Sequence, residues 1–155
     1  MSAAGLSIEQ TNDFSALEPR IVELLKAAVA DLTPAVHVLT AADLETVKES
    51  AQRVPALHVV SNGFAPIESQ YKAARLRHTW YVVAVVRNQA GQRSGAPARR
   101  DAGALLARAM GALLSEALPG ASTVLEPTAA PRGAHANGFF YLPSGWQVET
   151  VFRKP

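Results

Sequence analysis

The side chains best suited to chemistry in this sequence are its four histidines, His37, His58, His78 and His135. An imidazole binds a metal ion or exchanges a proton near neutral pH. No two of the four stand at a helical ligand spacing such as i, i+4. His58 and His78 lie in segments that read as neighbouring strands, so a two-histidine site is conceivable there. The plainer interpretation is that each is a strand residue satisfied by hydrogen bonds or water.

Other catalytic signatures are missing from the sequence. There is no cysteine, which excludes thiol catalysis, disulfides and cysteine-bound zinc. No glycine-rich nucleotide loop and no Gly-x-Ser-x-Gly turn is present. Asp43 and Glu45, and Glu45 and Glu49, are spaced as a solvated face or an interface would be, rather than as an acid/base pair. We therefore expect no enzyme, no cofactor and no metal.

A basic stretch from Lys72 to Arg108 offers a different chemistry. It carries eight basic residues against Asp101 alone, with Tyr71, Trp80 and Tyr81 near its start. Phosphate contacts combined with base stacking would suit such a stretch. A small nucleic-acid-binding or ligand-binding domain that uses residues 72–108 is therefore one candidate function.

The charges are unequally divided along the chain. Residues 1–71 carry four basic and nine acidic side chains, whereas residues 72–155 carry eleven basic and four acidic ones. This asymmetry indicates either nucleic-acid binding or complementary faces that meet in an oligomer. A third interpretation is that the two halves mix in the fold and their fields cancel.

One long strand positions much of this basic stretch. In the segment LRHTWYVVAVVRNQ, residues 76–89, the centre Val82–Val86 is apolar on both sides, as in a strand buried on both faces. Its beginning alternates between two sets of side chains, which are Leu76, His78 and Trp80 on one side and Arg77, Thr79 and Tyr81 on the other. The strand is thus expected to start outside the core and to end inside it.

The remaining patterns define the fold class. Helical periodicity covers residues 15–32, 41–52 and 99–118, strands are expected at 36–39 and 54–61, and residues 139–142 and 146–153 read as a hairpin that turns at Pro143–Gly145. Residues 64–73 are ambiguous, and residues 126–137 resemble a loop. The order predicts an α+β fold: a mostly antiparallel sheet with helices packed on one face and a C-terminal β-hairpin. We expect a flexible N-terminal arm over residues 1–14 and a single domain over residues 15–155.

The same segments resemble the tail terminator proteins of tailed bacteriophages, especially the Mu-like group. The resemblance lies in PRIVELLKAAVADL, RVPALHVVSNG, HTWYVVAVVRNQ, DAGALLARAMGALL and GFFYLPSGWQVETVFR, and it spans roughly residues 15–153. Other head–tail connector and minor tail proteins share similar layouts, so they remain alternatives. No run of apolar residues is long enough to span a membrane, and the N-terminus does not read as a secretory signal.

The resemblance implies a structural virion protein of the tail or neck, synthesised in the host cytoplasm. Such a protein forms a homo-oligomeric ring, commonly a hexamer, that caps the tail tube, stops its polymerisation and joins the tail to the head connector or stopper protein. DNA passing through the ring lumen would be a further contact. No catalytic residues are carried over from the family.

A ring requires that one patch of each subunit meets a different patch on its neighbour. A long strand that overruns its partners offers an edge for such a contact. The candidate interface residues are Arg75, Arg77, Trp80, Tyr81, Arg87, Arg93, Arg99, Arg100, Glu45 and Glu49.

Overall fold

The computed structural model describes residues 6–45, 48, 51–88 and 95–155. The strands are β1 (His37–Thr40), β2 (Ala56–Gln70), β3 (Ala73–Arg87), β4 (Glu126–Thr128), β5 (Ala134–Ala136) and β6 (Phe139–Arg153). The helices are α1 (Ile8–Thr11), the 3-10 helix η1 (Phe14–Ala16), α2 (Leu17–Val29), α3 (Ala41–Leu44) and α4 (Ala96–Leu113). Two of the candidate interface residues, Glu49 and Arg93, lie outside the described residues.

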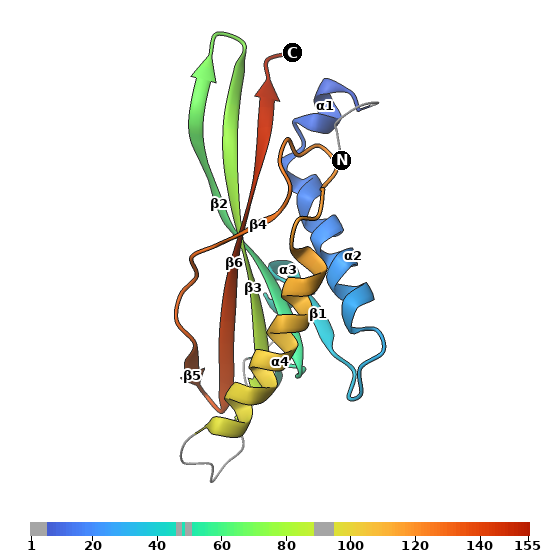
Figure 1. The fold of residues 1–155 in the computed structure, drawn as a ribbon, viewed down its shortest axis with the longest axis vertical. Helices are drawn as coiled ribbons and strands as arrows, with labels where there is room; N and C mark the ends of the chain where they lie inside the picture. Colours follow the sequence, from blue (N-terminus) through green and yellow to red (C-terminus); the bar gives the residue numbers. More distant parts are fainter. Residues whose placement is uncertain (1–5, 46–47, 49–50, 89–94) are drawn as a thin grey trace.

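The strands form one sheet in the order β1-β2-β3-β6-β4, and β5 also pairs with β6 (Figure 1). The pairing of β1 with β2 is parallel, whereas the other described pairings are antiparallel. The helices α2 and α4 lie on one side of this sheet. The predicted α+β class with a mostly antiparallel sheet is therefore confirmed.

Three of the strands, β2, β3 and β6, are each fifteen residues long, which corresponds to about 50 Å of extended chain. β3 lies between the other two and pairs with β6 over its whole length, from Ala73 opposite Arg153 to Arg87 opposite Phe139. The segment 64–73, which was ambiguous in the sequence, is the second half of β2 and the two-residue turn that leads into β3.

The C-terminal hairpin is present, but its turn lies earlier than expected. β5 and β6 are joined by Asn137 and Gly138, which have φ angles of 50° and 85°. Positive φ at both positions is typical of the tight turns that match the twist of a hairpin. The expectation of a turn at Pro143–Gly145 was wrong, because these residues lie within β6.

Pro143 can occupy a strand because β6 has a local gap on one side. β4 pairs with β6 at Gly145–Gln147 and β5 pairs at Phe139–Tyr141, so neither reaches Pro143. A proline cannot donate a ladder hydrogen bond, and it is tolerated where a strand edge is open. Gly145, next to this gap, allows the backbone of residues 128 and 129 to approach β6 closely.

The helices follow the apolar periodicity of the sequence. α2 buries Leu17, Ile21, Leu25 and Val29, four positions that are each four residues apart. α4 buries a broader stripe, which consists of Ala98, Ala102, Leu105, Leu106, Ala109 and Leu113. The helix expected over residues 41–52 is much shorter, since α3 ends at Leu44.

The main core lies between these two helices and one face of the sheet. Its sheet side consists of alternate residues of the long strands, among them Leu57, Val59, Trp80, Val82, Ala84, Trp146 and Val148. A smaller cluster on the opposite face contains Leu39, Ala56, Val85 and Phe139. The helices therefore cover one face, as predicted. The end of the long strands that carries Ala56, Val85 and Phe139 is buried on both faces.

Part of the expected N-terminal arm contacts the end of β6. The Asn12 side chain accepts a hydrogen bond from the backbone N–H of Arg153 (3.1 Å) and donates one to the Arg153 carbonyl (2.8 Å). The amide group thus continues the strand ladder at its last residue.

Among the described helices, none is long and apolar enough to cross a membrane.

We expect Gly145→Ala to lower the free energy of unfolding by about 1–3 kcal/mol, the usual cost of overpacking. An added Cβ would press against the carbonyl oxygen of Ala129 and lie 2.8 Å from that of Thr128, and both are backbone atoms. Urea unfolding followed by circular dichroism measures the change.

The matched control is Gly111→Ala in α4, where the added Cβ would meet no heavy atom within 4 Å apart from its chain neighbours and the backbone of its own helix. This change should raise the free energy of unfolding by about 0.5–1 kcal/mol, because alanine is the better helix former. Equal midpoints for the two variants would contradict the described approach of residues 128 and 129 to β6.

Candidate subunit interface

The long strands continue beyond the layer of helices. We call this part the sheet extension; it consists of residues 64–70 of β2, 73–78 of β3 and 148–153 of β6, which pair with one another. In the described part of the chain β1 covers β2 only at Ala56–Val59. Residues 61–70 of β2 are all exposed, and at this end of the molecule β3 and β6 lie between β2 and α1 (Figure 1).

One face of the extension is aromatic. Phe14 of η1 packs against it, with ring centroids 5.1 Å from Phe64, 5.5 Å from His78 and 6.4 Å from Phe152. Phe64 remains 52% exposed. Leu76, His78 and Trp80 lie on this face, as the alternation predicted, but all three are buried.

The proposal of Trp80 as a contact residue therefore needs correction. Its side chain is 4% exposed and belongs to the main core between the helices and the sheet. The sequence expectation placed it on a solvated extension. The helices cover the sheet as far as Trp80, which the sequence interpretation had placed outside the core.

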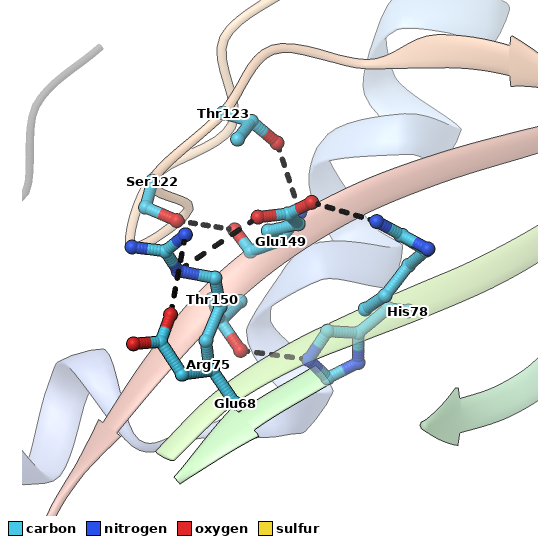
Figure 2. A network of polar contacts seen from close by, with 8 residues as sticks. Glu68, Arg75, His78, Ser122, Thr123, Glu149 and Thr150 are labelled. Atoms are coloured by element: carbon cyan, nitrogen blue, oxygen red, sulfur yellow. Dashed lines mark hydrogen bonds and ion pairs between the residues drawn. The ribbon is translucent and has the colours of Figure 1, made fainter. Parts of the chain in front are cut away.

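The other face of the extension carries an ion-pair network (Figure 2). Glu149 accepts a hydrogen bond from Arg77 (3.2 Å) and lies 4.0 Å from Arg75, which also faces Glu68 at 3.8 Å. The Glu149 side chain is only 20% exposed. Neither Glu68 nor Glu149 was a candidate in the sequence, since their pairing with the arginines depends on the strand register.

The backbone of β6 at Glu149 is also fixed from its outer edge. Its N–H donates to the Thr123 hydroxyl (2.9 Å), and its carbonyl accepts from the Ser122 N–H (2.8 Å) and hydroxyl (3.1 Å). The segment 122–123 thus takes the place of a neighbouring strand. Glu149 is held on both its backbone and its carboxylate.

The two histidines that could have formed a site do not meet. His58 pairs with Val83 and His78 with Phe64 and Val148, which places their side chains on opposite faces of the sheet. His78 Nε2 lies 2.8 Å from the Thr150 hydroxyl, whereas His58 packs at 6.5 Å from the Tyr141 ring. The described residues contain no group of three or more side chains suited to a metal ion.

The remaining candidates are dispersed. Tyr81 accepts a hydrogen bond from Asn62 (3.2 Å), below the ion-pair network. Arg87, at the other end of β3, lies with its guanidinium 5.0 Å from the Phe139 ring centroid. Arg99 and Arg100 are exposed in the first turns of α4, and Glu45 is exposed directly after α3. The described candidates thus do not form one common surface.

The basic stretch is consequently not one surface. Arg75 and Arg87 are twelve residues apart on a single strand, about 40 Å at the usual rise of an extended chain. The two halves of the chain also interleave, because β2 pairs with β3 along its length and Asp31 pairs with Arg108 at 2.9 Å. The unequal charge of the halves does not produce two opposed faces.

Three large side chains on the extension are exposed, of which the sequence analysis named only Tyr71, as an aromatic beside the basic stretch, and missed the other two. Phe64, Ile67 and Tyr71 are 52%, 39% and 88% exposed, and all lie on the β2–β3 hairpin. A signal existed in the sequence: Phe64, Ile67 and Tyr71 are large apolar or aromatic side chains within a short, otherwise mostly polar segment. The irregular spacing of these residues hid the strand.

We expect the protein to lose stability as pH falls below about 6.5. Burial lowers the pKa of both His58 and His78 from the ordinary value of 6.5. Below that value the unfolded chain takes up protons that the folded chain does not, so the stability present above it is progressively lost. Urea unfolding at about pH 7.5 and 5.5 measures the loss.

The control for this prediction is a chain with His58→Gln and His78→Gln. Its free energy of unfolding should change less over the same pH interval, because carboxylates titrate mainly at lower pH. The same pH dependence in the variant and the unchanged chain would show that other groups cause it.

Comparison with known proteins supplies one assignment. A family model described as "Phage tail terminator protein" matches residues 11–155. No curated protein matches the sequence. One solved structure, whose title states no function, is similar over 97% of this chain and 99% of its own, with 16% identity and a TM-score of 0.42.

Proposed function

The chain belongs to the phage tail terminator family, and on that premise we propose that it caps the head-proximal end of the tail tube as a ring. The ring stops tube polymerisation and joins the tail to the head connector. The observation that carries this proposal is the family match, which includes every described strand and the helices η1, α2, α3 and α4. Membership of this family makes the chain a structural protein of the phage tail, and so a component of the virion.

The ring is proposed as a hexamer of this chain. A closed ring needs two different patches on each subunit that fit one another. The described candidates that remain exposed are suited to such patches: Arg75 on the sheet extension, Arg87 and Arg100 near the opposite end of β3, and Glu45 after α3. Arg77 is less suited, because its guanidinium is engaged by Glu149 at 3.2 Å.

Two further partners follow from the proposal. One surface of the ring would meet the tail tube protein, and the other would meet the connector or stopper protein. DNA that passes through the lumen would meet exposed cations such as Lys72, Arg153 and Lys154 at the extension. Contacts of this kind are independent of base sequence and weaken with salt. We propose no catalytic step and no cofactor.

We expect tail tubes assembled without this chain to grow to uncontrolled lengths, and tubes assembled with it to stop at a uniform length. In electron micrographs of labelled protein, a ring should be present at one end of each tube. The physical reason is that a bound ring covers the surface to which the next tube ring would add.

The control is tube protein polymerised with an unrelated protein at the same concentration. Label distributed along the tube wall, or tube lengths that do not depend on the added chain, would overturn the proposed function. Gel filtration of the chain alone over a range of concentrations separately measures whether the ring forms before it meets the tube.

A further inference from the structure

A cavity lies at the end of the molecule opposite the hairpin. It has a volume of about 670 Å³, in the range of pockets that hold a ligand or a side chain of a partner. Its walls are mostly apolar and come from the segment after α2, from the residues just before β2, from the end of β3 and from α4. They include Leu32, Pro34, Val54, Val86 and Leu105.

The cavity also contains charges of both signs, from Arg87, Asp101 and Arg108. Arg108 is already engaged, since it donates to Asp31 (2.9 Å) and to the Ala28 carbonyl (3.1 Å). Arg87 lies over the Phe139 ring and is exposed. The group that suits this site is a large apolar side chain with a polar end, accompanied by a carboxylate and a cation.

The β2–β3 hairpin presents such a group. Its tip, residues 64–72, ends in a two-residue turn in which Tyr71 is 88% exposed. Ile67, earlier in the same hairpin, is exposed at a bulge between Pro66 and Glu68. A tyrosine combines apolar area with a hydroxyl that seeks a partner. One charge of each sign lies near it: Lys72, whose Nζ is 5.8 Å from the Tyr71 ring centroid, and Glu68, which is half-exposed and 3.8 Å from Arg75.

The tip is built for contact through side chains rather than through its strand edge. β2 has register shifts between Ser61 and Phe64 and between Pro66 and Glu68. Bulges and a proline on an edge strand prevent continuous pairing with another strand. A partner of this hairpin must therefore receive its side chains.

The tip cannot reach the cavity of its own chain. β3 begins at Ala73 beside the tip and ends at Arg87 on the cavity wall, so the two sites are separated by the length of the strand, about 50 Å. A contact between them is possible only between two molecules. Because the two surfaces differ, the same contact repeats from copy to copy.

We propose that the hairpin tip of one copy fills the α4 cavity of the next. Tyr71 enters the apolar cavity, Glu68 faces Arg87, and Lys72 faces Asp101. This inference rests on the proposed function for its occupant, a second copy of the same chain. It adds to that function the two surfaces that meet in the ring.

The first test uses two variants that each remove one side of the contact. Tyr71→Ser removes the side chain of the tip, and Ala104→Trp fills the cavity, which Ala104 lines. Analytical ultracentrifugation should show self-association weakened on the order of 30-fold in each, the loss expected of a central interface anchor. An equimolar mixture should form dimers and nothing larger, since it contains one intact contact for each pair.

Matched controls change neighbouring positions outside the contact. Ser61→Asp alters an exposed residue of β2 outside the tip, and Ala107→Trp adds the same bulk to an exposed position of α4 that does not line the cavity. Both should associate as the unchanged chain does. Circular dichroism and thermal unfolding of all four variants identify any that fail to fold.

The second test is covalent. The chain contains no cysteine, so Tyr71→Cys together with Ala104→Cys introduces the only thiols. Oxidation should give a ladder of linked copies on a denaturing gel, whereas each single cysteine should give at most a dimer.

Three outcomes overturn the inference. If Tyr71→Ser and Ala104→Trp assemble as well as the controls, the ring uses other surfaces and the proposed function stands. If Tyr71→Ser forms rings that no longer bind tubes, the tip contacts the tube protein instead. If the unchanged chain stays a single copy both in solution and on tube ends, the ring and this contact fail together.

Discussion

The pairing of β3 with β2 on one side and β6 on the other is the interaction on which the rest of the structure depends. These strands are paired over nearly all of their fifteen residues, and their hydrogen bonds determine which side chains share a face. Because the side-chain period of a strand is two, one register places Trp80 and Val82 under the helices and Arg75 and Arg77 on the opposite side. The core, the ion-pair network and the hairpin tip all result from this register.

The helices then divide the long strands into two parts with different roles. Where α2 and α4 lie on the sheet, apolar residues are buried and the fold is stabilised. Where α2 and α4 end, the same three strands continue with η1, α1 and residues 121–123 beside them. The extension leaves Phe64, Ile67 and Tyr71 exposed to water, which is unfavourable for a monomer. Exposed apolar groups that lie together at one end are typical of surfaces that meet a partner.

Residues with a regular period were predictable, and those governed by tertiary contacts were not. The stripe of α2 and the alternation from Leu76 to Tyr81 could be read directly, because each residue's face depends only on its position in the repeat. Pro143 and Gly145 were misread as a turn because the gap beside β6 that accommodates them is formed by distant strands. The second half of β2 was hidden because its bulges interrupt the period of two. The burial of Trp80 and the partners of Glu149 depend on segments brought together only by the fold.

The two-sided pairing of β3 also restricts how the molecule can change its length. Adding one residue to the extension would exchange the faces of every residue beyond it, so that an arginine would turn toward Phe14 and His78 toward the open side. Adding two residues, with matching additions in β2 and β6, would keep each side chain on its face and lengthen the sheet by about 7 Å. The hairpin can therefore change its reach in two ways: by steps of two residues in paired strands, or by single residues absorbed in bulges such as the two that β2 already contains.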